Sequence, residues 1–148
     1  MLAARIQERL TSHSLAVAAQ AAARCHAQLH LAVDGLGPRA LRRWKQALET
    51  STAAGQLALL CTDQGRGNLG CRMLRQWQHG FEQGAEAVVL IGTDLPTLEC
   101  LDLEAAFARL QTQPLVLGPA SDGGYWLIGL NRQGYARSGH RLMGGIRW

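Results

Sequence analysis

Helical patterns and short apolar runs alternate along this chain, and this alternation limits its possible folds more than any other feature. The apolar runs are 29–34, 56–61, 87–92, 114–118 and 124–130. The predicted helices are 2–25, 38–49, one marked by the stripe Leu69, Met73, Trp77 and Phe81, and one marked by Leu103, Ala106, Phe107 and Leu110. The order predicts an α/β protein with helices on both faces of a sheet.

The strand at 87–92 is apolar at every position, which is typical of buried parallel strands. We therefore expect a three-layer α/β/α sandwich with a mainly parallel sheet. A chain of 148 residues is long enough for one core, so a single domain over 1–148 is predicted. The stretch from 131 to 148 gives no predicted element.

Carboxylates follow the predicted strand ends, which is where α/β proteins place their sites. Asp34, Asp63 and Asp94 each come within a few residues of such an end. Asp94 and Asp122 together would give two hard oxygen ligands, as Mg²⁺ or Mn²⁺ requires beside substrate phosphates. The alternative for Asp122 is a turn, because the two glycines after it tolerate positive φ angles. The residues alone leave both interpretations open.

The segment "GRGNLG", Gly65 to Gly70, matches the G-x-G-x-x-G pattern of dinucleotide-binding turns. Asp94 follows where a ribose-binding acid is expected. Against this, "TDQ" separates the glycines from the predicted strand, and other elements precede the unit. A dinucleotide-binding protein is therefore kept as an alternative function.

Charge and composition exclude several classes. The net charge is +4, but the basic residues carry no nucleic-acid-binding motif, so no nucleic-acid partner is expected. No apolar run approaches the roughly 20 residues that span a bilayer. The four cysteines include no C-x-x-C pair, which suits a cytoplasmic protein.

Four longer motifs carry a family resemblance: "QGRGNLGCRM", "VVLIGTDLPTL", "DLEAAFARL" and "LVLGPASDGGYWLIGL", within 64–130. In order and spacing they resemble a bacterial family of glycosyltransferases of the GT-A, or nucleotide-diphospho-sugar transferase, type. Some members of that family are linked to arsenosugar biosynthesis. The resemblance implies a glycosyltransferase, rather than a nucleotidyltransferase, with a nucleotide-sugar donor, an unknown acceptor and a divalent cation, Mg²⁺ or Mn²⁺.

The resemblance also implies roles for individual residues. Asp94 stands at the family's "GTD" acid and Asp122 at its "DGG" acid, so both are expected to be catalytic and to bind the metal. The implied substrate-binding residues are Gly67, Asn68, Gly70, Thr93, Gly123, Gly124 and Tyr125. Asn68 replaces the acid of the family's "GDLG", so a charged role at this position is not expected.

The ends of the chain depart from the family pattern. Members open with a strand and a basic loop that faces the nucleotide, whereas this chain begins within the following helix and stops at "GGIRW". We therefore expect the usual first strand to be missing. An open sheet edge would favour a homo-oligomer. A non-catalytic remnant, or a nucleotide-binding module of the same fold, is the alternative to an active transferase.

Overall fold

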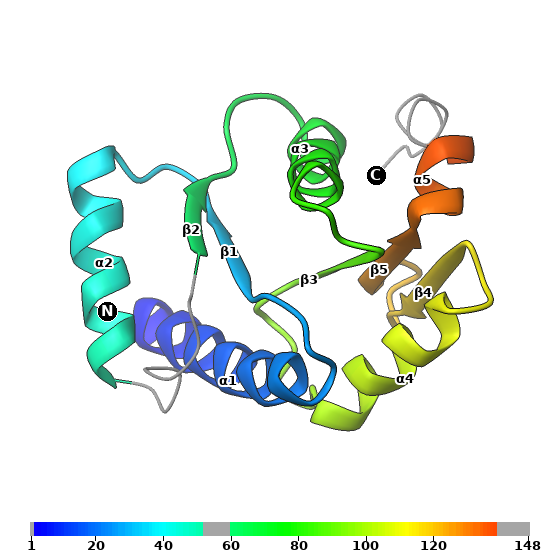
Figure 1. The fold of residues 1–148 in the computed structure, drawn as a ribbon. Coiled ribbons are helices and arrows are strands. Elements are labelled where there is room, and N and C mark those ends of the chain that lie inside the picture. The colour runs from blue at the N-terminus through cyan, green and yellow to red at the C-terminus, as the bar shows by residue number, and fades with distance from the viewer. Residues whose placement is uncertain (1, 52–59, 139–148) are drawn as a thin grey trace. The chain divides into compact units, whose positions relative to one another are not determined.

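The computed structural model describes residues 2–51 and 60–138 of the chain. Up to β5 the elements follow one another in the predicted order (Figure 1): α1 (Leu2–Arg24), β1 (His30–Val33), α2 (Pro38–Ser51), β2 (Leu60–Asp63), α3 (Leu69–Glu82), β3 (Ala87–Ile91), α4 (Cys100–Leu110), β4 (Leu115–Pro119) and β5 (Tyr125–Asn131), after which α5 (Arg132–Ser138) follows. The predicted strand 56–61 lies outside the described residues up to position 59. The alternation of helices and strands is confirmed.

The chain divides into two compact units. The first contains Met1–Asp63 and Thr93–Glu104, and the second contains Gln64–Gly92 and Ala105–Trp148. Helix α4 contributes its first turn to one unit and its remainder to the other. The single domain expected from the sequence stays a prediction.

The first unit is built on a parallel pair of strands. β1 and β2 run side by side in register from His30↔Leu60 to Val33↔Asp63. Alternate residues of this segment, Leu31 and Val33 among them, share one face of the pair. Leu15 of α1 is buried against Leu31 in this cluster. Two amphipathic helices thus obtain their buried face from a two-stranded sheet.

The second unit is built on a three-stranded sheet in the order β3-β5-β4. Trp77 and Phe81 of α3 are buried in one cluster with Ile128 and Leu130 of β5. On the opposite face, Leu110 of α4 lies against Gly129 of β5. The part of the predicted stripe formed by Met73, Trp77 and Phe81 therefore packs in the core, whereas Leu69 at the start of α3 is exposed. Helices cover both faces of this sheet.

The expectation of a mainly parallel sheet is wrong for the second unit. β5 is antiparallel to both β3 and β4. The connection 120–124 between β4 and β5 is far too short for a crossover, so these strands have to pair antiparallel. The continuous apolar character of β3 reports burial on two faces and says nothing about strand direction. A three-layer sandwich over the whole chain and the missing first strand stay predictions.

Helix α5 has no counterpart among the predicted elements. The Asn131 side chain accepts a hydrogen bond from the N–H of Gly134 at 2.8 Å, which caps the start of the helix. The Tyr135 ring stacks on Phe81 with 4.6 Å between centroids. A helix this short shows little periodicity in the sequence, so its contact with α3 decides its formation. Residues 139–148 lie outside the described part.

Candidate functional site

Asp94 lies in the segment that joins β3 to α4. Directly after β3, the N–H of Gly92 donates to the carbonyl oxygen of Trp126 at 3.2 Å. Thr93 is half-buried and Asp94 is exposed. The predicted acid therefore follows the end of an apolar strand closely, and its carboxylate is accessible to a ligand.

The part of this segment that follows the acid is anchored in the first unit. Leu98 is buried to 1% exposure, and its N–H donates to Leu95 O at 3.4 Å. The His13 ring donates from Nε2 to Leu98 O at 3.1 Å, since a carbonyl oxygen can only accept. The N–H of Glu99 donates to Asp102 Oδ2 at 2.9 Å, which caps α4. A buried leucine and two hydrogen-bonded residues thus fix the segment.

The first turn of α4 is joined to the end of α1 by one carboxylate. Arg24 Nη1 donates to Glu104 Oε1 at 2.8 Å, and Cys100 Sγ donates to the same oxygen at 3.2 Å. The hydrogen bond from Arg24, followed by that from Cys100, lowers the pKa of Glu104. Burial, followed by the hydrogen bond to Glu104, raises the pKa of the Cys100 thiol. The thiol therefore keeps its proton and is a poor nucleophile.

Asp122 lies in the hairpin that joins β4 to β5. The N–H of Ala120 donates to Gly124 O at 2.9 Å, and the N–H of Gly123 donates to Ala120 O at 3.2 Å. Asp122 Oδ1 accepts from the N–H of Gly124 at 3.0 Å, and Gly123 has φ +90°. The turn role is thus observed directly. The Asp122 side chain is exposed as well, so a binding role is compatible with the turn.

Tyr125, an implied substrate-binding residue, is half-buried at the start of β5. Its side chain packs against the core cluster that contains Trp77 and Phe81. Burial raises the pKa of the Tyr125 phenol, so the ring remains neutral at physiological pH. Packing accounts for the aromatic part of this side chain.

The glycine-rich loop lies immediately before α3. Gly65 and Gly67 have φ angles of +75° and +111°, and Gly70 belongs to the first turn of the helix. Asn68 is the N-cap, because its Oδ1 accepts from the N–H of Cys71 at 2.9 Å. Asparagine and aspartate cap helices about equally well. The cap therefore survives the replacement of the family's acid by Asn68.

Two arginines of α3 hold this loop, and the sequence reasoning did not identify them. Arg75 donates from Nη1 to the carbonyl oxygen of Gln64 and from Nη2 to that of Arg66. Arg72 Nε donates to Gly67 O at 3.0 Å. The signal for them was their spacing, since residues three apart share one face at the start of the helix that follows the glycines.

In the second unit's sheet, the strand that precedes Asp94 pairs with the strand that follows Asp122. In the β3–β5 register, Ile91 is opposite Leu127, one step before the Gly92–Trp126 hydrogen bond. The chain leaves β3 toward Asp94 at the end of the sheet where it enters β5 from the 120–124 hairpin. Asp34 follows β1, and Asp63 ends β2, in the first unit.

Within 2–51 and 60–138, no group of three or more His, Cys, Asp or Glu side chains is arranged to hold a metal ion. Mg²⁺ typically takes one or two protein carboxylates and completes its shell with water and phosphate oxygens. Asp94 in the first unit and Asp122 in the second are each exposed.

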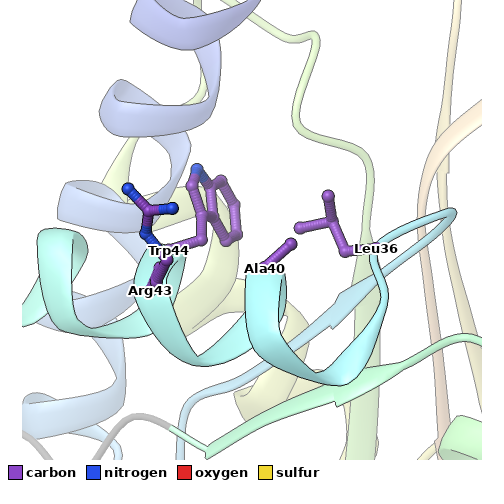
Figure 2. A pocket seen from close by; sticks show the side chains of 4 residues that line it. All are labelled: Leu36, Ala40, Arg43 and Trp44. Carbon is purple, nitrogen blue, oxygen red and sulfur yellow. The ribbon is translucent and has the colours of Figure 1, made fainter.

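The surface hollow on α2 contains none of the predicted site residues. It measures about 390 Å³ and is lined by Leu36, Ala40, Arg43 and Trp44, as Figure 2 shows. Its lining offers one guanidinium and no carboxylate that could bind a metal ion. No helix in the described ranges has the length and apolar character needed to cross a membrane.

The fold is that of a nucleotide-diphospho-sugar transferase-like protein. The chain is similar to a crystal structure from Desulfovibrio desulfuricans G20 described as a "putative nucleotide-diphospho-sugar transferase", with 31% identity and a TM-score of 0.75. The match covers 95% of this chain and 56% of that protein, so the chain spans little more than half of its length.

The family follows from the sequence itself. Residues 15–148 match the model of the family described as "Uncharacterized protein conserved in bacteria (DUF2064)", and the chain belongs to this family. The comparison with curated proteins gave no match.

Proposed function

We propose that this chain is a glycosyltransferase domain that takes a sugar from a nucleotide-diphospho-sugar donor with the help of a divalent cation. The observation that carries the proposal is the strand pairing of β3 and β5. Within the second unit's sheet, this pairing sets the end of β3, after which the chain continues to Asp94, beside the start of β5, which follows Asp122. The likeness to a protein described as a nucleotide-diphospho-sugar transferase supports the choice of donor.

Each acid has a role in this proposal. Asp94 is exposed after an anchored strand, so it offers a fixed carboxylate to Mg²⁺ or Mn²⁺. One oxygen of Asp122 accepts a hydrogen bond within its own turn. The other oxygen can bind the metal or a sugar hydroxyl, or can act as a base toward the acceptor hydroxyl. A bound cation stabilises the negative charge that develops on the diphosphate leaving group.

The implied substrate contacts divide between the two loops. Thr93 precedes Asp94, and Gly123 and Gly124 follow Asp122, so these residues accompany the two acids. Gly67, Asn68 and Gly70 belong to the other loop, whose role in binding the nucleotide stays a proposal. The acceptor and the identity of the sugar are not specified by these residues.

Calorimetry with UDP- and GDP-sugars tests the proposal in the presence and absence of Mn²⁺. We expect binding that depends on the metal and that Asp94→Asn abolishes, because the amide keeps the shape of the side chain but loses its charge. Glu82→Gln is the matched control, since it removes one carboxylate from the exposed end of α3. Binding that is equal in wild type and Asp94→Asn would contradict the role of Asp94.

The same titration separates the alternatives. A well-folded chain that binds no nucleotide and no nucleotide sugar supports the non-catalytic remnant. Binding of NAD or FAD that is lost when Gly65 is replaced supports the dinucleotide interpretation. We expect no such binding, because side chains of α3 already contact the Gly65–Gly70 loop.

Three expectations about partners and location stay predictions. The first is self-association through an open strand edge. In the described part of the chain, β4 pairs with β5 alone and exposes Leu115 and Leu117. The others are the lack of a nucleic-acid partner and a cytoplasmic location. Sedimentation of the purified chain tests the first of these.

A further inference from the structure

Arginine side chains of α3 hold the 64–68 loop by donating hydrogen bonds to carbonyl oxygens of the loop. Arg75 contributes two N–H groups, one to Gln64 O and one to Arg66 O. The planar guanidinium presents its donors as a rigid fork, which suits two acceptors at once. Arg72 adds a third contact at Gly67 O, 3.0 Å away. Three carbonyl oxygens of the loop, those of Gln64, Arg66 and Gly67, thus accept hydrogen bonds from arginines of one helix.

The direction of these carbonyls fixes the direction of the neighbouring N–H groups. In a trans peptide, the C=O of one residue and the N–H of the next point to opposite sides. The contacts at Arg66 O and Gly67 O therefore turn the N–H groups of Gly67 and Asn68 away from the guanidinium groups. A pair of backbone donors directed this way suits an acceptor oxygen on a ligand.

Gly65 completes the arrangement by leaving space for the guanidinium. A Cβ at this position would lie 2.7 Å from Arg75 Nη1 and 3.0 Å from Cζ. Its φ of +75° also lies in the region that side chains avoid. The lack of a side chain at Gly65 therefore leaves the space that the Arg75 guanidinium occupies.

We propose that Arg75 is a positioning residue, which shapes the 64–68 loop so that the N–H groups of Gly67 and Asn68 face an acceptor oxygen of the nucleotide donor. This inference rests on the proposed function for its ligand. In this proposal Arg75 donates its hydrogen bonds to carbonyl oxygens of the loop and does not contact a phosphate of the substrate.

Arg75→Ala tests the proposal through the loop itself. Amide hydrogen exchange, followed by mass spectrometry of the peptide that contains 64–70, should accelerate by roughly tenfold, because two charge-assisted hydrogen bonds are lost. Exchange in β3 and β5 should not change. Arg109→Ala is the control, since it removes an exposed arginine from α4 in the same unit. The affinity for UDP or GDP should fall by about the same factor.

Chemical rescue distinguishes positioning from general stability. Ethylguanidinium added to Arg75→Ala should restore both slow exchange and nucleotide affinity, because it supplies the same forked donor. Ethylammonium should restore neither, because it lacks the fork. A structural role spread over the whole unit would not respond to a small guanidinium compound.

Unchanged exchange of the 64–70 amides in a folded Arg75→Ala variant overturns the proposal. If Arg75→Ala does not fold, Arg75→Lys replaces it in the experiment, because lysine keeps the charge and most of the side chain. Amide exchange of 64–70 should accelerate in Arg75→Lys as well. Exchange at the wild-type rate in Arg75→Lys also overturns the proposal. If wild type binds no nucleotide while its loop still responds to Arg75→Ala and to ethylguanidinium, the proposed function fails and the clamp by Arg75 stands.

Discussion

The two glycine-containing turns of the second unit, 64–68 and 120–124, are stabilised in opposite ways. The first is held by side chains of the helix that follows it, through Arg72, Arg75 and the cap of Asn68. The second is held by its own backbone and by Asp122. A Cβ on Gly65 would meet a guanidinium at 2.7 Å, whereas a Cβ on Gly123 would meet nothing within 4 Å.

This difference indicates which turn has room for a ligand on the side toward which a Cβ of its glycine would point, here called the glycine side. At 64–68 the protein fills that side, and the loop can only offer the opposite one. At 120–124 the glycine side is open, next to an exposed carboxylate. Two glycine-rich motifs that look equivalent in the sequence therefore present different surfaces.

The largest expected effect comes from placing alanine at each glycine. Gly123→Ala should cost about 1 kcal/mol, the penalty of a side chain at positive φ. Gly65→Ala should cost about 2–3 kcal/mol, because it also displaces Arg75. Urea unfolding of both variants measures the difference. In Gly65→Ala combined with Arg75→Ala, the loss should be smaller than the sum of the two single losses. Equal losses for Gly65→Ala and Gly123→Ala would show that the guanidinium is not the obstacle.

The helix cap of the first turn gives the next effect. Asn68→Ala should destabilise the protein by about 1 kcal/mol, because the N–H of Cys71 loses its acceptor. Asn68→Asp should keep the cap and gain a few tenths of a kcal/mol from the helix dipole. Thermal unfolding compares the two variants with wild type. An unchanged midpoint for Asn68→Ala contradicts the capping role.

Asp122 allows the turn role and the binding role to be separated. Asp122→Ala should cost about 0.5–1.5 kcal/mol, since the N–H of Gly124 loses its partner. Asp122→Asn should stay within about 0.5 kcal/mol of wild type, because its amide oxygen accepts the same hydrogen bond. Both should lose metal-dependent binding of the nucleotide sugar. Binding of the nucleotide sugar by Asp122→Asn with wild-type affinity would contradict the binding role of Asp122 and support its role in the turn alone.

The smallest expected effect concerns Glu104, which lies outside both turns and therefore serves as a reference. Arg24 and Cys100 lower the pKa of Glu104 in the folded state, so the carboxylate stabilises the fold above its unfolded pKa. This contribution should be lost as the pH falls below the ordinary glutamate pKa of about 4.3 and through the lower pKa of the folded state. The Glu104→Gln variant should lose less stability across that range in urea titrations. The same pH dependence of stability in wild type and Glu104→Gln would show that Glu104 does not contribute in this way.

Much of the fold follows from local patterns. The stripe at Trp77 and Phe81 has helical spacing, so it was identifiable as a buried face before any contact was known. The direction of β5 was missed because an apolar strand has the same composition in either direction. The short 120–124 connection does predict the direction of β5 relative to β4, since such a connection permits only an antiparallel pair.

The sequence names candidate site residues, and their roles stay predictions. Asp94 and Asp122 were found by their positions after and between apolar runs, and the structure leaves both exposed. Arg72 and Arg75 were missed because arginines on a helix are usually solvated surface residues, and only the path of the loop reveals three carbonyl oxygens within their reach. Helix α5 was missed for a similar reason, as its stacking on Phe81 joins residues far apart in the chain.

The sequence by itself determined the order of helices and strands, the buried stripe of α3 and the acids at the ends of apolar runs. These depend on residue spacing within one element, which the chain carries locally. Only the tertiary structure decided the direction of β5, the clamp of α3 on the loop before it, and the open side of the 120–124 turn. Each of these depends on which backbone groups meet across the fold, and local spacing does not encode that.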